Sequence, residues 1–294
     1  MRSVMGIMIV AGALSACTSS PEKTATNGSP AAVTAPALID IPPAPDQSIS
    51  KLSTTNQSFL GDLDAVTGRG YLRILVAPSR AHFQTVDGRH RGLAVDAGFA
   101  LAGTLSDAAK RDVTPVFIET REDQLIPSLL AGKGDVAANV RLSFARDEQV
   151  AFAPPIKTGI RELVVTDVSS RLVSLEDVGG RTIQVRKNSD HHASLLRLNE
   201  QLKKISRPPA TIVADDRTLT DEDLLDGVNA GRIRATIVDE YIFDYWQKQF
   251  PKIASINREV AVSQDGTLSW VTRKDAPKLA EFLNEFFATH RLTF

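Results

Sequence analysis

The protein is a chain of 294 residues in which 34 lysine and arginine residues face 35 aspartate and glutamate residues, a formal net charge of −1. Hydrophobic residues make up 43% of the chain, which excludes wholesale disorder, and the near-zero charge gives no electrostatic footprint for nucleic acid. The single cysteine excludes an internal disulfide and a cysteine-rich zinc site.

The first seventeen residues have the features of an export signal. Arg2 supplies a positive charge, an apolar run follows over residues 4–14, and small residues lead into Cys17. The run is too short for a permanent membrane span but suits the apolar part of a signal peptide. Residues 14–17 resemble the lipobox of bacterial lipoproteins, whose cysteine is lipidated. We therefore expect a signal peptide over residues 1–16 and a lipid anchor on Cys17, with a plain secretory signal and an incidental cysteine as the alternative.

Residues 17–57 differ in composition from the rest of the chain. They hold six of the 15 prolines, at positions 21, 30, 36, 42, 43 and 45, among alanine, serine and threonine. Such a stretch buries too little apolar surface to offset its backbone entropy. It predicts an extended tether between the anchor and a folded unit.

From about residue 58 onward, strand-like and helix-like patterns alternate. The expected strands are residues 71–76, 113–118, 135–140, 181–185, 211–214, 233–238 and 268–272. The expected helices are residues 92–105, 125–130, 189–203, 224–230 and 241–250, with a last amphipathic helix around residues 279–287. This alternation predicts an α/β fold with mixed, mainly parallel sheets and helices on both faces.

Several motifs follow one another in a recognisable order. They are residues 70–74, the Gly92-x-x-x-Asp96 helix entry, residues 125–136, residues 139–155 and residues 185–199. Over residues 68–292 this order resembles the family 3 solute-binding proteins, and within them most closely the N-terminal domain of membrane-bound lytic transglycosylase F. The resemblance implies a two-lobed periplasmic binding protein type II fold with two hinge crossings, near residues 160–167 and 257–262. Lobe 1 would then comprise residues 58–163 and 258–294, and lobe 2 residues 164–257.

The resemblance also implies a ligand site in the cleft between the lobes. Arg146 takes the position whose arginine clasps a ligand carboxylate, and Asn139 lies at the start of the same motif; an ordinary surface arginine is the alternative for Arg146. Asp239 matches the aspartate that accepts a ligand ammonium, although it also suits a helix cap. Ser189 stands where family members offer a hydroxyl and backbone N–H groups to an anionic ligand end, and a simple N-cap is equally compatible with its sequence.

Two departures from the family pattern bear on the ligand. Arg80, followed closely by Phe83, stands where amino-acid binders place an aromatic that stacks on the ligand, and Arg141 stands where serine or threonine is common. If Arg80 and Arg141 face the cleft with Arg146, the site is strongly cationic and suits a dicarboxylate or a cell-wall peptide fragment. If they point to solvent, that extra charge is absent from the site.

The sequence contains no motif that predicts a metal site, a catalytic residue or a cofactor. Adjacent His191 and His192 point in different directions on a helix, so we expect no metal site. The chain has no nucleophile elbow and no phosphate loop, so we expect neither a catalytic residue nor a cofactor. It ends at Phe294, about where transglycosylase F relatives continue into their catalytic domain, so we expect no glycan cleavage.

The combined expectation is a monomeric, lipid-anchored solute-binding protein on the periplasmic face of a bacterial membrane, the outer membrane in a Gram-negative cell. It would capture a small anionic or zwitterionic ligand and serve a membrane permease or a cell-wall enzyme. Two alternatives stay open. One is a non-catalytic, muropeptide-binding regulator related to lytic transglycosylase F, and the other is an enzyme on the same fold resembling cyclohexadienyl dehydratase.

Overall fold

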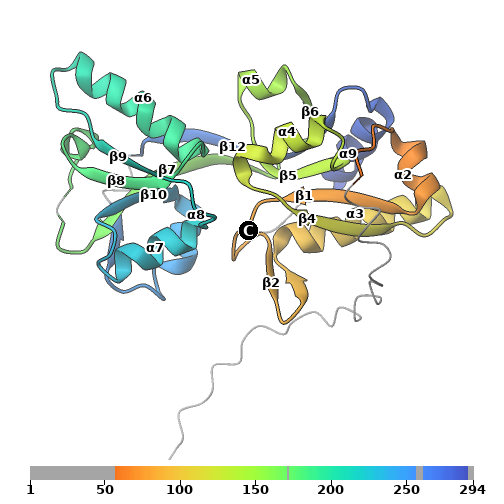
Figure 1. Cartoon of the computed structure of the whole chain (residues 1–294), viewed down its shortest axis with the longest axis horizontal. Coiled ribbons are helices and arrows are strands. Elements are labelled where there is room, and N and C mark those ends of the chain that lie inside the picture. Colours follow the sequence, from red (N-terminus) through yellow and green to blue (C-terminus); the bar gives the residue numbers. More distant parts are fainter. Residues whose placement is uncertain (1–56, 171, 256–260, 291–294) are drawn as a thin grey trace, which may run out of the picture. The chain divides into compact units, whose positions relative to one another are not determined.

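The computed structural model describes residues 57–170, 172–255 and 261–290 (Figure 1). The predicted signal peptide, Cys17 and nearly all of the predicted tether lie outside the described residues, as does most of the predicted return crossing at residues 257–262. Within the described part of the chain, no helix combines the length and the apolar character that a membrane span requires.

The described strands form one mixed sheet with the order β4-β1-β5-β12-β7-β10-β8-β9, and a separate hairpin pairs β2 with β3. Two further short strands join the sheet beside this path, β6 on β12 and β11 on β7. The strands are β1 (Tyr71–Val76), β2 (Gln84–Val86), β3 (Arg89–Arg91), β4 (Thr114–Glu119), β5 (Val136–Arg141), β6 (Val150–Phe152), β7 (Lys157–Asp167), β8 (Thr182–Arg186), β9 (Thr211–Asp215), β10 (Ala235–Asp239), β11 (Ile253–Ser255) and β12 (Ser263–Arg273).

Helices follow most of the strands, as the alternating pattern predicts. The α-helices are α2 (Leu63–Arg69), α3 (Leu93–Ala109), α4 (Leu125–Leu130), α5 (Phe144–Asp147), α6 (Asp190–Lys204), α7 (Asp221–Asn229), α8 (Glu240–Trp246) and α9 (Pro277–Thr289). Two short 3₁₀ helices, η1 (Glu122–Gln124) and η2 (Leu175–Val178), complete the set within the described residues.

The sheet contains two parallel groups of strands. In lobe 1, β1 pairs in parallel with β4 and β5, and in lobe 2, β8 pairs in parallel with β9 and β10. Between these groups run the two 11-residue strands β7 and β12, which pair antiparallel with each other. β7 also pairs antiparallel with β10 of lobe 2, and β12 pairs antiparallel with β5 of lobe 1. The fold is therefore α/β, as expected, with parallel pairing inside each lobe and antiparallel pairing where the lobes join.

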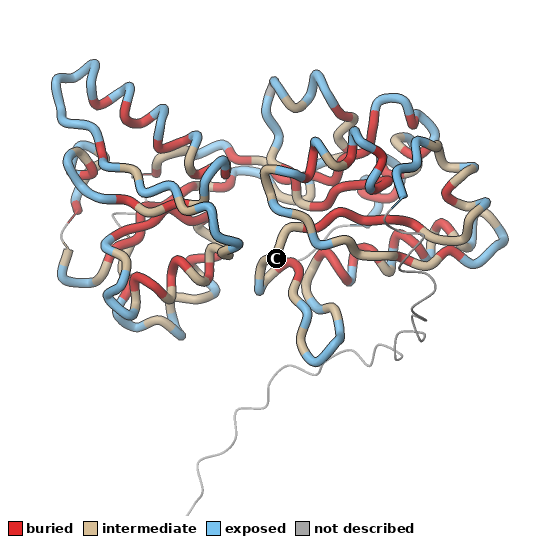
Figure 2. The backbone as a smooth tube through the Cα atoms, viewed as in Figure 1, coloured by how far each residue is buried: buried red, intermediate tan, exposed pale blue. Residues whose placement is uncertain are grey.

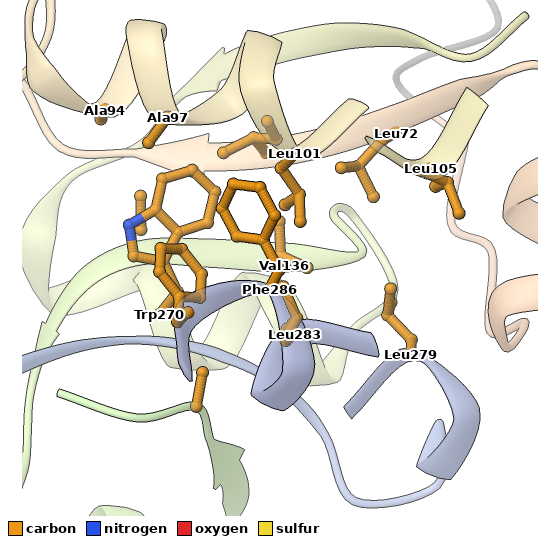
Figure 3. Packing of buried hydrophobic residues seen from close by; sticks show 14 of the residues in the cluster. Leu72, Ala94, Ala97, Leu101, Leu105, Val136, Trp270, Leu279, Leu283 and Phe286 are labelled. Carbon is orange, nitrogen blue, oxygen red and sulfur yellow. The ribbon is translucent and has the colours of Figure 1, made fainter. Parts of the chain in front are cut away.

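Within the parallel groups β1 and β10 are buried at nearly every position, whereas the edge strand β9 is largely exposed (Figure 2). In lobe 1, Leu72 and Ile74 of β1 face the cluster formed with α3 and α9, whereas Leu75 packs against α4 on the other face. Trp270 of β12 is fully buried in the first of these clusters, beside Leu101 and Phe286 (Figure 3).

Lobe 2 repeats this layered arrangement with other helices. Val164 of β7 and Ile183 of β8 belong to the cluster that contains the apolar face of α6. Leu163 and Val165, which point to the opposite face of β7, pack with residues of α7 and α8. Because successive side chains of β7 point to opposite faces, this one strand packs against helices on both faces of the sheet.

The strand β7 carries the chain from lobe 1 to lobe 2. Its first half pairs with β12, where Ile160 lies opposite Gly266, and its second half pairs with β10, where Val165 lies opposite Thr236. The outward crossing predicted near residues 160–167 therefore falls within a strand that belongs to both lobes. The described start of β12, Ser263, lies opposite Glu162.

Candidate functional site

Charged and polar side chains gather where parallel strands end. Ser79 and Glu122 follow β1 and β4, Arg141 ends β5, Arg186 ends β8 and Asp239 ends β10. Because the carboxyl ends of parallel strands share an edge, residues from both lobes meet at one pocket of about 80 Å³. Its other lining residues are Val76, Ala77, Pro78, His82, Ala94, Leu125, Ala138, Asn139, Asp190, His191, Asp221, Tyr241, Ile242 and Leu268.

An ion pair between the lobes crosses the centre of this pocket. Nη2 of Arg141 lies 2.5 Å from Oδ1 of Asp239, and its guanidinium also lies 3.8 Å from carboxylate oxygens of Glu162 and Asp190. Burial by itself lowers the pKa of Arg141, but these three carboxylates outweigh it and raise that pKa. Burial likewise raises the pKa of Asp239, but Arg141 and His191 bring it down to about 2. Both groups are therefore charged at neutral pH.

His191 provides a second cation within the same network. Its Nε2 lies 3.1 Å from Oδ1 of Asp239, and its Nδ1 lies 3.7 Å from Oδ1 of Asp221. Burial alone lowers the pKa of His191, but Asp221 and Asp239 raise it to about 9, so the imidazole is protonated at neutral pH. The neighbouring His192 is turned away, and its Nδ1 accepts the backbone N–H of Asn188.

Three residues of this network have side chains of the kind that bind metal ions. Glu162, His191 and Asp239 are buried, and each offers one ligand atom within 4.8 Å of the others. Both carboxylates already face cations, because Arg141 lies 2.5 Å from Asp239 and 3.8 Å from Glu162, and His191 lies 3.1 Å from Asp239. This donor set fits an ion-pair network better than it fits a metal ion.

A second ion pair between the lobes involves Arg146. Its Nη2 lies 2.8 Å from Oδ1 of Asp190, and its Nη1 donates to Oδ2 of Asp190 at 3.1 Å and to the carbonyl oxygen of Arg141 at 2.8 Å. Asp190 is the first residue of α6, directly after Ser189, which is the N-cap and accepts the backbone N–H of His192. The guanidinium therefore holds both oxygens of one carboxylate.

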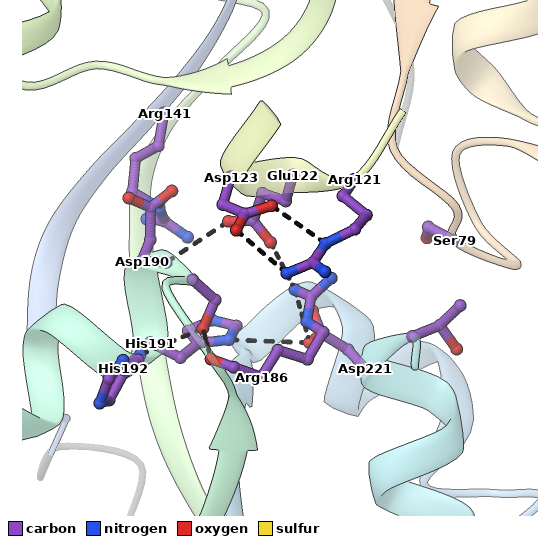
Figure 4. A network of polar contacts seen from close by, with 12 residues as sticks. Ser79, Arg121, Glu122, Asp123, Arg141, Arg186, Asp190, His191, His192 and Asp221 are labelled. Atoms are coloured by element: carbon purple, nitrogen blue, oxygen red, sulfur yellow. Dashed lines mark hydrogen bonds and ion pairs between the residues drawn. The ribbon is translucent and has the colours of Figure 1, made fainter. Parts of the chain in front are cut away.

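A third ion pair has the opposite polarity. Nη2 of Arg186, in lobe 2, lies 2.8 Å from Oε2 of Glu122 in lobe 1 and 2.9 Å from Oδ1 of Asp221 (Figure 4). The backbone N–H of Asp190 also points to Oε1 of Glu122 at 3.4 Å. Burial, with Asp190 and Asp221 nearby, raises the pKa of Glu122 although Arg186 lowers it.

Beside the pocket, α7 contacts the loop that follows β1. Oε1 of the fully buried Glu222 accepts a hydrogen bond from Oγ of Ser79 at 3.1 Å and from the backbone N–H of Ala81 at 3.2 Å. Arg80 and Asp223 form a half-exposed ion pair at 2.7 Å. The cleft is therefore bordered by several polar contacts between the lobes.

The structure brings together some, but not all, of the residues expected from sequence. Asn139, Arg141 and Asp239 line the pocket, and Arg146 lies beside it through Asp190. Asn139 adopts a positive φ of 55°, a conformation that asparagine tolerates better than most residues.

The other three expected residues lie elsewhere. Ser189 lines a smaller neighbouring pocket and acts as the N-cap of α6. Arg80 pairs with Asp223 and does not line the main pocket, and Phe83 is 2% exposed within the core of lobe 1. In that core the ring of Phe83 lies near the ring of Phe117, with their centroids 6.0 Å apart.

The sequence allowed a strongly cationic cleft, but in the structure the three arginines concerned are paired with acidic side chains. Arg80, Arg141 and Arg146 all belong to lobe 1, and each pairs with an acidic side chain of lobe 2. The positive charge of one lobe is thus matched by the negative charge of the other. Asp239 precedes α8, yet its carboxylate makes no capping hydrogen bond and is directed to Arg141 and His191 instead.

Sequence reasoning missed several residues of the pocket. Glu122 and Arg186 carried a usable signal, because each lies at or just beyond the end of a predicted parallel strand, the place where ligands bind in such folds. Asp221 and Asp190 could not be recognised as site residues from the sequence, because each lies in the first turn of a helix, where acidic residues are common.

Two lobes of parallel strands, joined by long shared strands and enclosing a charged pocket at the strand ends, define a two-lobed ligand-binding protein. The profile of the family described as "Bacterial extracellular solute-binding proteins, family 3" matches residues 72–292, and the chain belongs to this family. Proteins of this family are extracytoplasmic, and a domain of this kind generally binds a ligand without catalysing a reaction.

Curated relatives and solved structures agree with this assignment. The chain is 26% identical over 167 residues to "Membrane-bound lytic murein transglycosylase F" of Saccharophagus degradans, covering 55% of this chain and 32% of that protein. A protein of the same name from Nitrosospira multiformis is 23% identical over 180 residues, 61% of this chain and 35% of its own length. The chain thus spans about a third of the length of these relatives.

The solved structures show the fold. A variant of the arginine-binding protein ArgBP from T. maritima has a TM-score of 0.62 at 22% identity, covering 77% of this chain and 91% of its own. The amino acid ABC transporter substrate-binding protein AbpA from Streptococcus pneumoniae, bound to L-arginine, has a TM-score of 0.63 at 18% identity, covering 76% and 90%.

Proposed function

We propose that the protein captures a small zwitterionic ligand, such as a free amino acid, between Arg141 of lobe 1 and Asp239 of lobe 2. The observation that carries the proposal is their 2.5 Å contact inside the pocket. A zwitterion that enters between them exchanges one ion pair for two, because its carboxylate meets the guanidinium and its ammonium meets the aspartate.

Polar atoms around this pair support the same ligand chemistry. Nη1 of Arg141 and Nε of Arg186 are buried donors that have no hydrogen-bond partner among the described residues. Oε2 of Glu162 is a buried acceptor in the same situation, close to Asp239. Two buried donors and one buried acceptor in the same network suit a ligand with a carboxylate and an ammonium group.

The size of the pocket supports a small ligand. The free volume is only about 80 Å³ and Arg141 lies 2.5 Å from Asp239, so even a small ligand requires the lobes to separate before it can insert between them. Movement about the long strands β7 and β12 would provide this opening and closing.

The proposal extends to where the protein acts. A signal peptide over residues 1–16, a lipid on Cys17 and a proline-rich tether would place a monomeric binding protein at an extracytoplasmic membrane surface. Its partner would then be a permease that accepts the bound amino acid.

A second candidate function follows from the curated relatives. Their shared name is that of a cell-wall enzyme, which favours a regulator that binds peptide fragments of the wall. The smaller pocket, which shares Pro78, Glu122 and Arg186 with the main one, would take the extension of such a peptide.

Ligand screening tests these proposals. We would follow the melting temperature with the twenty L-amino acids, succinate, glutarate and a purified muropeptide, and measure the Kd of each ligand that raises it. Arg141→Gln and Asp239→Asn should each weaken amino-acid binding at least about 30-fold, because each removes one charge-assisted contact.

Matched controls are Arg232→Gln and Asp226→Asn, which remove an exposed ion pair of lobe 2 and should leave Kd unchanged. Selective stabilisation by the muropeptide favours the second candidate. A screen without any stabilising compound, or variants of Arg141 and Asp239 that bind like the unmodified protein, contradicts the proposed function.

A further inference from the structure

We propose that the side chain of Asp190 occupies the carboxylate-binding position of the cleft, so that it decides which ligands reach Arg146. The inference rests on the proposed function, in which the arginines of lobe 1 bind a ligand carboxylate. It adds a specificity-determining residue that competes with that ligand from within the chain.

The contacts of Asp190 are those of a bound carboxylate. Its two oxygens lie 2.8 and 3.1 Å from the two terminal nitrogens of Arg146, and Nε of Arg141 lies 3.8 Å from Oδ2. Two guanidinium groups from lobe 1 therefore face one carboxylate from lobe 2; Figure 4 shows Asp190 with Arg141.

The position of Asp190 in the fold explains why it is well placed to compete. It lines the pocket as the first residue of the 15-residue helix α6, whose amino end favours negative charge. Its side chain is 22% exposed, so the carboxylate lies at the accessible side of the network and not deep in a lobe. The side chain of Asp239, by comparison, is 8% exposed.

A competing internal carboxylate has a definite consequence for selectivity. A ligand carboxylate must either displace Asp190 from Arg146 or be confined to Arg141. Ligands with one carboxylate can use Arg141 alone, whereas a second anionic group meets the negative charge of Asp190. Replacement of Asp190 by a neutral residue should therefore favour carboxylate ligands, and dicarboxylates most of all.

Anion rescue tests this directly and needs no knowledge of the natural ligand. Asp190→Ala removes a carboxylate group from between two guanidinium groups, and formate has the size and charge of the group removed. With excess sodium formate the melting temperature of Asp190→Ala should rise by about 3 °C relative to sodium chloride at the same ionic strength. The unmodified protein and the control Asp226→Ala, whose aspartate pairs with exposed Arg232, should show no such difference.

A second measurement uses Asp190→Asn, which keeps the size of the side chain and serves if the alanine variant folds poorly. Its Kd for glutarate should fall at least about 10-fold relative to the unmodified protein, because an anionic competitor has become neutral. Its Kd for the diamide of glutarate, which carries no charge, should not change.

The outcomes separate the two proposals. Equal formate responses in Asp190→Ala and Asp226→Ala, or an unchanged glutarate Kd in Asp190→Asn, overturn the role of Asp190 even where the unmodified protein binds amino acids. Formate rescue in a protein that binds no amino acid supports the role of Asp190 and overturns the proposed amino-acid ligand.

Discussion

The buried charges that line the pocket are compatible with folding because each has a partner of opposite sign. Asp239 illustrates this, since it is 6% exposed and contacts both Arg141 and His191. Removing one member leaves the others without compensation, which costs more than the pair itself contributes. Individual residues of the site therefore affect stability as well as binding.

The protonated state of His191 predicts a dependence of stability on pH. Its pKa of about 9 in the folded protein exceeds the value of 6.5 for a free histidine, so its contribution is complete below about pH 6.5 and is lost as pH rises through 9. The loss amounts to at most about 3 kcal/mol. Urea unfolding between pH 6 and 10 should show this decline, and His191→Gln should flatten it. A decline of the same size in His191→Gln would show that other titrating groups cause the loss of stability.

At the scale of secondary structure, Asp62 joins two helices that are far apart in the sequence. Its Oδ1 accepts the backbone N–H groups of Leu63 and Leu279 at 2.8 Å, and its Oδ2 accepts that of Lys278 at 3.1 Å. One carboxylate therefore caps the amino ends of both α2 and α9. Burial raises the pKa of Asp62, but these three N–H groups outweigh it and lower that pKa.

Replacing Asp62 by alanine should destabilise the protein by about 1–3 kcal/mol, because two helix caps are lost together. The contribution of Asp62 is present above the pKa of an unfolded aspartate and disappears as pH falls through its lowered folded value. Denaturant unfolding at pH 7 and at pH 3 measures both effects. Asp64→Ala, two residues away, removes an exposed ion pair with Lys278 and is the control; an equal loss in both variants would argue against a capping role.

Gly266 of β12 links strand geometry to the site. A Cβ at this position would come within 2.9 Å of the backbone oxygen of Ile160 and would overlap Nη1 of Arg141. Gly266→Ala should therefore displace the guanidinium and weaken ligand binding by about 10-fold or more, measured by calorimetry. Gly103→Ala, in α3 with open space around it, should leave Kd unchanged and stabilise the helix slightly. Normal ligand affinity in Gly266→Ala would mean that Arg141 can move without loss.

At the scale of the whole folded unit, the two lobes share one sheet. β7 and β12 pair with each other and with strands of both lobes, so neither lobe completes its sheet without them. The buried apolar clusters of the two sides are separate, although Ala81 of lobe 1 packs against the cluster of α7 and α8. Cooperativity between the lobes therefore depends on the shared strands and on the ion pairs across the cleft.

This arrangement predicts a single unfolding transition for both lobes. Leu101→Ala in lobe 1 and Leu195→Ala in lobe 2 each remove a fully buried side chain and should cost about 2–5 kcal/mol. Both variants should shift the same calorimetric transition to lower temperature. Two resolved transitions, each moved by only one variant, would show that the lobes unfold independently.

The sequence alone determined the elements whose pattern is local. The helix expected over residues 92–105 is Leu93–Ala109, and the helix expected over 189–203 is Asp190–Lys204, capped by Ser189. Local sequence patterns predicted less well those strands that form mainly because they pair with a neighbouring strand. The first half of β12, Ser263 to Thr267, is polar and contains a glycine, and it is a strand because it pairs with β7. The hairpin β2–β3 was missed although Asp87-Gly88 is a turn signal.

The identities of the ion-pair partners depended on the tertiary structure. Arg141 and Asp239 are 98 residues apart, and Arg146 and Asp190 are 44 apart. Helix caps and apolar periodicity reflect neighbours within a few residues, so the sequence indicated Arg141, Arg146 and Asp239 as site residues through family resemblance only. Which carboxylate faces which arginine is decided by the strand ends that the fold brings together. For that reason Asp190 is an ordinary first-turn residue in the sequence and a competitor for the ligand site in the structure.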